Sequence, residues 1–286
     1  MRGYKQFGYI YLMKFVKQLF DFYLNASVHV ALSVYCLLRI TAILNDIELN
    51  SHLTFFLFFG TISCYSFIKY GVEAEKYILV SNSYHRSIQV FSILCLIVSA
   101  YHGIYLQADS WIILVILILL TGLYAIPVLP QVKNLRNLGW LKIVMVALVW
   151  AGVTVVLPIT EIGQDLNWDN LVSLVQRILL VLVLLIPFEI RDMAYDKPEL
   201  NTIPQRIGVT KTKVFGAFLV LVYFFLTFLK DEITPLELIS KGLIFLALGV
   251  MIYVTKRNQS KYYASFWVEA IPVFWLCVVL VLNYFS

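Results

Sequence analysis

The stretch NLVSLVQRILLVLVLLIPFEIRDMAYD, residues 170–196, joins the two features that decide the fold of this chain. Its first part, residues 170–190, is an apolar run of the length that crosses a membrane, since the hydrocarbon layer takes about 20 residues of helix. Its second part places carboxylates and an arginine at the end of that run. The stretch therefore predicts a transmembrane helix that ends in a polar site.

The composition of the whole chain also indicates a membrane protein. Of its 286 residues, 61% are hydrophobic and 14% are charged, whereas soluble domains carry about 25% charged residues. So few charges cannot cover the surface of a globular domain, which excludes a soluble enzyme and a disordered regulator. Alternation with a period of two is absent, so the runs are predicted as helices. The predicted fold class is an all-α, polytopic membrane protein.

Nine apolar runs are long enough to be transmembrane helices. They cover residues 22–44, 52–68, 88–106, 111–129, 138–157, 170–190, 214–229, 236–254 and 263–285. No soluble domain or long linker separates them, so residues 22–286 are predicted to form a single transmembrane domain. Residues 1–21 carry lysines among aromatic and aliphatic residues, which predicts a basic amphipathic segment on the membrane surface.

Charges between the predicted spans indicate the orientation of the chain. Most of the 22 Lys and Arg residues fall in the N-terminal segment and in the loops on the same side, whereas the loops on the other side hold only Lys230. The positive-inside rule then predicts a cytoplasmic N-terminus and a C-terminus outside. No basic stripe alternates with stacking aromatic residues, so we expect the lipid bilayer and no nucleic acid as a partner.

Three carboxylates lie at the cytoplasmic end of the sixth predicted span. Asp192 and Asp196 are four residues apart and Glu189 precedes Asp192 by three, so all three share one face of a helix. Carboxylates this close repel one another unless a cation lies between them, and oxygen ligands at this spacing suit Mg²⁺. The alternative interpretation is a solvated helix end whose acids pair with neighbouring arginine and lysine residues.

The acidic cluster is followed by Thr202-Ile203-Pro204-Gln205-Arg206-Ile207-Gly208. An aspartate pair followed by Thr-x-Pro-x-Arg-x-Gly resembles the second aspartate-rich motif of the UbiA superfamily of intramembrane prenyltransferases. The Arg191-Asp192 dipeptide resembles the motif found in one branch of that family, the branch that prenylates dihydroxynaphthoate for menaquinone. A second block, LYAIP at residues 123–127 with GWLK at residues 139–142, resembles that family's connection between the fourth and fifth spans. The resemblance implies a UbiA-like bundle of nine helices around a central apolar cavity, in a bacterial inner membrane.

The first aspartate-rich motif of that family is altered in this sequence. The family has Asn-Asp-x-x-Asp-x-x-x-Asp at the end of the second span, where this chain has YSFIKYGVE at residues 65–73. Lys69 replaces one expected metal ligand and Glu73 replaces another, while Tyr65, Lys69 and Glu73 still share one helical face. The resemblance therefore implies a Mg²⁺ site at the second motif and leaves the first site doubtful.

The resemblance implies Mg²⁺-dependent transfer of a polyprenyl group from its diphosphate to a small aromatic acceptor, as in quinone biosynthesis. The implied metal ligands are Asp192, Asp196 and Glu189, and the implied catalytic residues are Asp192, Asp196 and Lys69. The implied diphosphate-binding residues are Lys69, Arg191, Lys133, Arg136 and Lys142. The aromatic faces expected to stabilise an allylic carbocation in the cavity are those of Tyr65, Tyr70, Tyr124 and Tyr195.

Two alternative functions are compatible with the sequence. If Lys69 pairs with Asp192 or Asp196 and takes the place of the metal, the protein is a degenerate pseudoenzyme that binds lipid or quinone. A transporter is the third interpretation, because charged residues within spans often line a pathway. Those residues are Arg39, Arg177, Lys241 and Glu269. No internal repeat supports a transporter.

Overall fold

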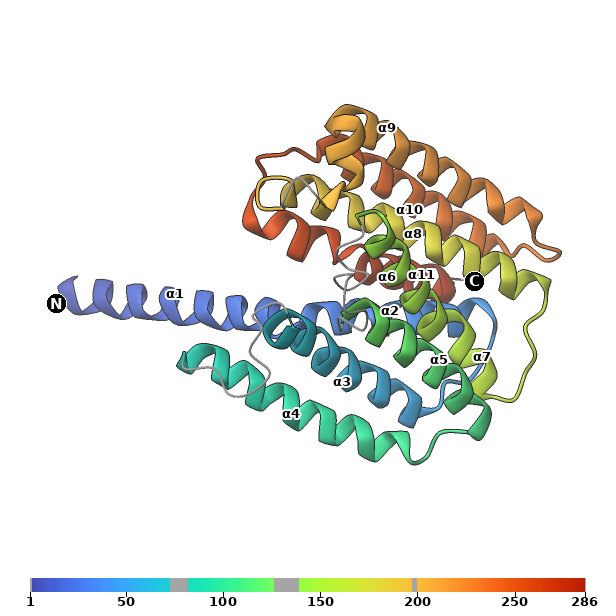
Figure 1. Ribbon diagram of the computed structural model, residues 1–286, viewed down its shortest axis with the longest axis horizontal. Helices are drawn as coiled ribbons and strands as arrows, with labels where there is room; N and C mark the ends of the chain where they lie inside the picture. The colour runs from blue at the N-terminus through green and yellow to red at the C-terminus, as the bar shows by residue number, and fades with distance from the viewer. Residues whose placement is uncertain (1, 73–81, 126–138, 197–199, 286) are drawn as a thin grey trace.

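The computed structural model describes residues 2–72, 82–125, 139–196 and 200–285, and every regular element in these ranges is helical (Figure 1). The elements are α1 (Arg2–Asn25), α2 (Val28–Leu44), α3 (Ser51–Phe67), η1 (Ile68–Val72), α4 (Ser83–Gly103), α5 (Ala108–Ala125), α6 (Leu141–Ala151), η3 (Gly152–Val156), α7 (Leu157–Glu161), α8 (Trp168–Asp192), α9 (Ile203–Phe225), η5 (Leu226–Leu229), α10 (Pro235–Val254), η6 (Tyr263–Val268) and α11 (Ile271–Phe285). The all-α prediction is confirmed.

The helices have the length and composition of membrane spans. Within the described ranges, 7 helices are long and apolar enough to cross a membrane, and the bent pair formed by α1 and α2 raises the number to 8. The remaining predicted span, residues 88–106, lies on α4, whose first turns carry the polar residues His85 and Arg86 and lower its mean hydropathy. The chain is therefore a polytopic membrane protein, with α4 as its most polar long helix after α1.

The first predicted span is not one straight helix. α1 and α2 meet at an angle of 57°, and Ser27 at the junction has a left-handed backbone with φ 60 and ψ 20. Figure 1 shows α1 extending away from the bundle, and residues 12–19 are exposed. No proline or glycine marks this break in the sequence, which explains why the hydropathy pattern predicted a continuous span.

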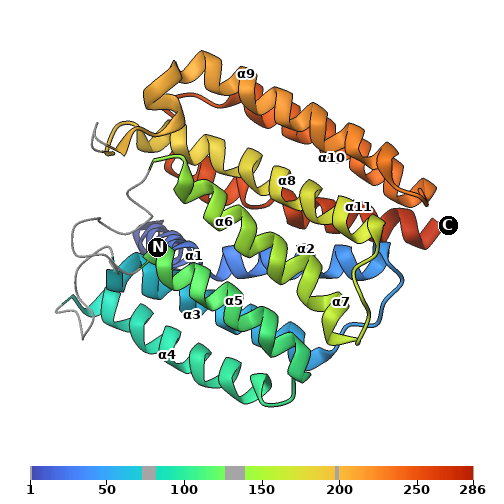
Figure 2. The ribbon, with the colours of Figure 1, turned by 45° about the vertical axis from the view of Figure 1, so that its right-hand side comes forward.

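The other helices form a ring. α2 packs against α3 and α11, α6 packs against α5 and α8, and α10 packs against α9 and α11. Figure 2 shows α3, α4 and α5 on one side and α9 and α10 on the other, with α2, α6, α8 and α11 between them. The main core lies between this middle group and α9 and α10, and it includes the fully buried Leu37, Leu180 and Ile186.

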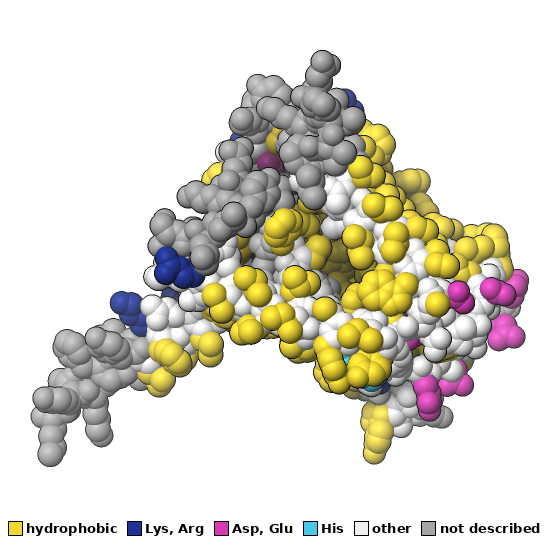
Figure 3. All heavy atoms as spheres, turned by 60° about the horizontal axis from the view of Figure 1, so that its bottom comes forward, with side chains coloured by type: hydrophobic (Ala, Val, Ile, Leu, Met, Phe, Trp, Pro, Cys, Tyr) yellow, Lys and Arg dark blue, Asp and Glu magenta, His cyan; other side chains and the backbone are white. Residues whose placement is uncertain are grey.

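The two ends of the bundle differ in charge. Figure 3 shows the Asp and Glu side chains gathered at one end and the Lys and Arg side chains at the other, with hydrophobic side chains between them. We call the end where α3, α5 and α8 finish the motif end, because it carries Asp192. We call the opposite end, where α10 begins at Pro235, the distal end.

α9 begins earlier than its apolar run predicted. The predicted span started at residue 214, but the helix starts at Ile203. Its first turn contains Pro204, and the Gln205 side chain accepts a hydrogen bond from the Thr202 amide at 3.0 Å. Gly208 then interrupts the helix with φ 81 and ψ 161, a region that is essentially restricted to glycine. The Thr-x-Pro-x-Arg-x-Gly pattern thus encodes a helix start and a bend.

Candidate functional site

A cavity of about 230 Å³ lies at the motif end between α3, α5, α6, α8 and α11. Its wall is mostly apolar, and its aromatic side chains come from four helices: Tyr65, Tyr124, Trp150 and Phe188. A smaller apolar cavity of about 90 Å³ shares Tyr65, Tyr124 and Trp150 with it and extends between α3, α5 and α6. Together they form a chamber for an apolar ligand, and the prediction of a central apolar cavity is confirmed.

Charged side chains are confined to part of the cavity wall. They are Lys142 from α6, Glu189 and Asp192 from α8, and Glu269 next to α11. Opposite charges and an apolar wall therefore share one chamber. Three of these four groups are acidic, so an anionic ligand group would enter this part of the cavity only together with a cation.

Lys142 joins two of the carboxylates that the sequence singled out. Its ammonium lies 2.8 Å from Glu189 Oε1 and 3.3 Å from Asp196 Oδ2. α8 ends at Asp192, but the Asp196 amide still donates to the Asp192 carbonyl at 2.8 Å. This bond continues the helical turn, which is why Glu189 and Asp196 reach the same lysine. The face that the sequence predicted for all three carboxylates is shared by Glu189 and Asp196 through this lysine, but Asp192 does not contact it.

Asp192 has a different partner. Its Oδ1 accepts a hydrogen bond from Arg191 Nε at 2.7 Å, and the Arg191 guanidinium lies 5.1 Å from the centre of the Phe188 ring. Both members of the pair are about one-third exposed. Exposed pairs of this kind add little to stability, so Asp192 can exchange Arg191 for another cation at small cost.

One buried carboxylate oxygen without a hydrogen-bond partner indicates how these carboxylates would fit Mg²⁺. Glu189 Oε2 is buried and has no hydrogen-bond partner among the described residues, although its other oxygen contacts Lys142. No group of three His, Cys, Asp or Glu side chains within the described ranges has the geometry of a metal site. Mg²⁺ usually takes one or two protein carboxylates and completes its shell with water and phosphate oxygens. Glu189 and Asp192, which both line the cavity, fit that smaller set.

Lys69 lies in η1, just after α3. It is exposed, its ammonium lies 5.4 Å from the centre of the Tyr70 ring, and it lies within the electrostatic range of Glu269 and Arg191. No ion pair joins it to Asp192 or Asp196, all three being in the described part of the chain. The pairing on which the pseudoenzyme hypothesis depends is made by Lys142 instead.

The predicted aromatic residues divide into two groups. Tyr65 and Tyr124 line the cavity, and the Tyr65 hydroxyl accepts a hydrogen bond from Trp150 Nε1 at 2.6 Å. Tyr70 instead donates to the Asn25 carbonyl at 3.2 Å, and Tyr195 is 85% exposed in the turn after α8. Tyr70 and Tyr195 therefore do not line the chamber in this structure.

Three residues from the sequence analysis lie outside the described ranges. They are Lys133, Arg136 and Glu73. The neighbouring block GWLK is described, and its Gly139 has φ 57. A Cβ atom there would lie 2.4 Å from the Leu200 carbonyl oxygen and 2.7 Å from that of Asn201. Glycine thus allows the two motif-bearing connections to contact each other directly.

Glu269 is a cavity residue that the sequence analysis had considered only for a transport pathway. It follows η6, a π-helical segment, and such segments leave carbonyl groups without their α-helical partners and are frequent at functional sites. Here His29 Nε2 bonds to the Phe266 carbonyl at 2.9 Å, and Ser33 Oγ donates to the Glu269 carbonyl. α2 therefore fixes the position from which Glu269 faces the cavity.

Trp150 is a cavity residue that the sequence analysis missed. It lies within a continuous apolar run, so neither charge nor spacing distinguishes it from ordinary core residues. Only the packing of α6 against α8 and the hydrogen bond to Tyr65 show its place.

Solved structures share this fold at low sequence identity. A UbiA homolog from Archaeoglobus fulgidus bound to Cd²⁺ matches with a TM-score of 0.62 and 11% identity over 90% of this chain and 98% of that chain. A UbiA homolog from the same organism bound to DMAPP and Mg²⁺ matches with a TM-score of 0.58 and 11% identity over 91% and 98%. A digeranylgeranylglyceryl phosphate synthase matches with a TM-score of 0.54 and 16% identity over 93% and 96%.

No protein-family model and no curated protein matches the sequence. The structural matches cover nearly the whole chain, so this chain has the fold of the UbiA homologs. The fold implied by the second-motif resemblance is confirmed.

Proposed function

We propose that this protein transfers a polyprenyl group from a prenyl diphosphate to a small aromatic acceptor in a Mg²⁺-dependent reaction. The observation that carries the proposal is the cavity of about 230 Å³ in which Lys142, Glu189 and Asp192 adjoin an aromatic and aliphatic wall. The similar UbiA homolog was solved with GPP and Mg²⁺ and with DMAPP and Mg²⁺, which supports the same ligand class here.

The diphosphate would bind at the charged part of the chamber. Lys142 and Arg191 now hold carboxylates at 2.7–3.3 Å, and both would exchange a carboxylate for phosphate oxygens when the substrate enters. That exchange frees Glu189 and Asp192 to act as ligands, with Asp196 beside them. Bound Mg²⁺ would neutralise charge on the departing diphosphate. Lys69, at the end of α3, would add a further positive charge from the opposite side.

The prenyl chain would occupy the apolar part of the chamber. Bond cleavage leaves an allylic carbocation, and the faces of Tyr65, Tyr124 and Trp150 offer it electron density. The Tyr65–Trp150 hydrogen bond at 2.6 Å holds two of these rings in place. The carboxylate of Glu269 would accept the proton that an aromatic acceptor loses after it is alkylated. Aliphatic walls exclude water, which would otherwise capture the cation.

The experiment is a diphosphate-release assay on the full chain in lipid bilayers. DMAPP, GPP and a longer polyprenyl diphosphate are supplied in turn with Mg²⁺ and simple aromatic acceptors. We expect Mg²⁺-dependent release that falls at least about 100-fold in Asp192→Ala, the scale of losing one charge-stabilising group. Asp165→Ala, an exposed distal-end residue, is the control and should retain full activity. No release with any donor, or equal release in the two variants, contradicts the proposal.

One observation favours a second candidate function, a protein that binds prenyl lipid or quinone without chemistry. Lys142 lies between Glu189 and Asp196, where a cation is required for the reaction. If this lysine cannot move, the chamber binds an apolar chain but no metal. Measurable Mg²⁺-dependent release of diphosphate excludes this candidate.

The cellular setting belongs to the same proposal. We infer a role in quinone-type biosynthesis, with the chain in a bacterial inner membrane and its motif end on the cytoplasmic side. The separation of basic and acidic ends in Figure 3 supports this orientation. We further propose that residues 1–21 lie on the membrane surface, where Lys14 and Lys17 contact headgroups. Protease accessibility of tags at the two termini tests the orientation.

A further inference from the structure

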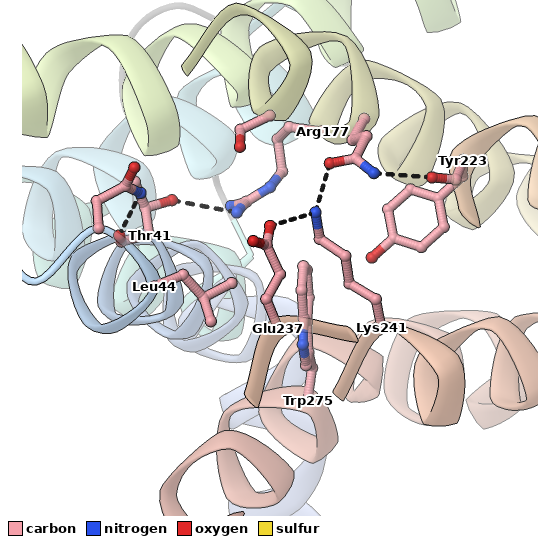
Figure 4. Close-up of a pocket in the computed structure, with 10 residues that line it drawn as sticks. Thr41, Leu44, Arg177, Tyr223, Glu237, Lys241 and Trp275 are labelled. Atoms are coloured by element: carbon pink, nitrogen blue, oxygen red, sulfur yellow. Dashed lines mark hydrogen bonds and ion pairs between the residues drawn. The ribbon is translucent and has the colours of Figure 1, made fainter. Parts of the chain in front are cut away.

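The distal end contains a second charged cluster, far from the proposed reaction site. Figure 4 shows Arg177 from α8 and Glu237 and Lys241 from α10 pointing toward one another between α2 and α11. Arg177, Glu237 and Lys241 are each at most 5% exposed, and the Lys230 side chain is 4% exposed. Buried charges within membrane spans are costly and are retained where they have a role.

The charges in this cluster do not balance. Glu237 Oε1 lies 2.6 Å from the Lys230 ammonium and 2.6 Å from that of Lys241, so one carboxylate serves two lysines. Arg177 has only neutral acceptors: the Leu37 carbonyl at 3.1 Å and the hydroxyls of Thr154 and Thr41 at 3.0 and 3.1 Å. No carboxylate pairs with Arg177 within the described ranges. The cluster therefore holds three cationic side chains and a single anionic one.

A small cavity lies where these side chains meet. Its volume is about 20 Å³, and its lining includes Arg177, Lys241, Tyr223 and Trp275, together with Glu237 and Gln176. The Gln176 side-chain oxygen accepts a hydrogen bond from the Lys241 ammonium at 2.5 Å. This is room for one water-sized ligand and excludes phosphate, sulfate or a carboxylic acid.

Two of the lining side chains have hydrogen-bond donors without acceptors. The Tyr223 hydroxyl and Trp275 Nε1 are buried and have no partner among the described residues. Tyr223 is 1% and Trp275 is 2% exposed. An indole N–H can only donate, and a buried unpaired donor is costly. These two donors therefore lack an acceptor, and because the cationic side chains of the cluster outnumber the single carboxylate, we expect the missing acceptor to be negative.

We propose that this cavity binds a single monatomic anion, such as chloride, held by Arg177, Lys241, Tyr223 and Trp275. The anion supplies the negative charge that Glu237 alone does not provide, and it accepts the two unpaired hydrogen bonds. Because the cavity is bordered by α2, α8, α9, α10 and α11, the bound ion joins these helices at the distal end. The site is separate from the prenyl chamber and does not depend on the proposed reaction.

The test is equilibrium binding of radioactive chloride to the purified full chain in detergent, at constant ionic strength with gluconate as the replacing anion. We expect one saturable site per chain that bromide displaces and gluconate does not, since gluconate exceeds the cavity. Tyr223→Phe removes one donor at nearly constant volume and should weaken binding about tenfold, the scale of one hydrogen bond to a charged group. Tyr263→Phe, which removes a hydroxyl bonded to the Met251 carbonyl, should bind chloride like the unmodified chain.

Bromide also gives an anomalous scattering peak, which would place the ion directly between Arg177 and Trp275. If Tyr223→Phe does not fold, as judged by circular dichroism, Trp275→Phe replaces it with the same expectation. Absence of saturable chloride binding means that the cavity holds water, and this overturns the proposal. Saturable binding that neither variant weakens places the ion elsewhere and overturns it equally.

Discussion

The two ends of the bundle both bury charge, but they do so in opposite ways. At the motif end, carboxylates outnumber the lysine that joins them, and the charges border a cavity of about 230 Å³. At the distal end, cations outnumber the carboxylate, and the space between them is about 20 Å³. The first arrangement can admit a large ligand and exchange its partners. The second has room for a small ligand only.

The comparison indicates that cavity size, more than charge alone, separates an exchange site from a fixed one. Lys142 is 16% exposed through the cavity, whereas the Lys241 side chain is 3% exposed. A carboxylate that leaves Lys142 can be replaced by a substrate group, whereas the loss of the carboxylate beside Lys241 leaves this buried ammonium only the neutral oxygen of Gln176. Loss of a charged side chain at the distal end should therefore affect mainly stability, and loss of one at the motif end should affect mainly activity.

The largest expected effect is at the distal end. Glu237→Gln removes the one carboxylate that faces Lys230 and Lys241, and an uncompensated buried charge costs about 3–5 kcal/mol. We expect this loss in the free energy of unfolding in detergent. Asp165→Asn, at an exposed distal position, should change it by less than about 0.5 kcal/mol. Similar values for the two variants would remove the distinction between the ends.

The next effect concerns turnover at the motif end. Lys69→Ala should lower diphosphate release about 100-fold while retaining the Mg²⁺ requirement, because a charge facing the diphosphate is lost and no buried pair is broken. The stability should hardly change, since Lys69 is exposed. Lys261→Ala removes another exposed lysine, whose partner is Asp21, and should keep full activity. Unchanged turnover in Lys69→Ala would assign no catalytic role to this lysine.

A smaller effect concerns the backbone that supports the motif end. Gly208→Ala places a Cβ on a residue with φ 81 and ψ 161, which should cost about 1–3 kcal/mol of stability. Gly249 lies in the regular helix α10 with open space around it, so Gly249→Ala should be neutral or stabilise the protein by up to about 1 kcal/mol. Thermal unfolding of the two variants should thus shift in different directions. Two equal shifts would contradict the glycine requirement at position 208.

The smallest effect is within the wall of the large cavity. Tyr65→Phe leaves Trp150 Nε1 without its acceptor, and we expect a loss of about 1 kcal/mol in the free energy of unfolding. Tyr253→Phe changes a residue that is 80% exposed and should have no effect. If Tyr65→Phe is also neutral, water or lipid accepts the hydrogen bond of Trp150 Nε1 in place of the hydroxyl. That result would show that this part of the cavity wall is accessible to water or lipid.

The fold was predictable from the sequence because a bilayer allows few solutions. Runs such as residues 170–190 and 236–254 must form helices to satisfy their backbone, and the structure has α8 and α10 there. The break at Ser27 and the early start of α9 were not predictable from hydropathy. The first depends on one left-handed residue without glycine or proline, and the second on polar turns that hydropathy assigns to a loop.

The candidate site was predictable where charge and spacing coincide. Glu189, Asp192 and Lys142 came from local motifs, and the structure brings them to one cavity. The pairing of Lys142 with Asp196 was not predictable, because the two residues are 54 positions apart and only the packing of α6 on α8 joins them. Trp150 carries no charge, and an apolar helix gives no periodic sign of which face lines a chamber.

The π-helical segment η6 also has a genetic consequence. A π-helical turn contains one residue more than an α-helical turn. The segment Tyr263–Val268 therefore holds one residue more than an α-helix of the same length would hold. Deleting one codon there would leave an ordinary α-helix and shift α11 by one residue, a rotation of about 100°, relative to the contact between His29 and the Phe266 carbonyl. The carboxylate of Glu269 would then turn away from the chamber while the composition of the span stayed almost the same. At this position, we expect the deletion of one residue to change the chemistry of the cavity as strongly as the substitution of a side chain that lines it.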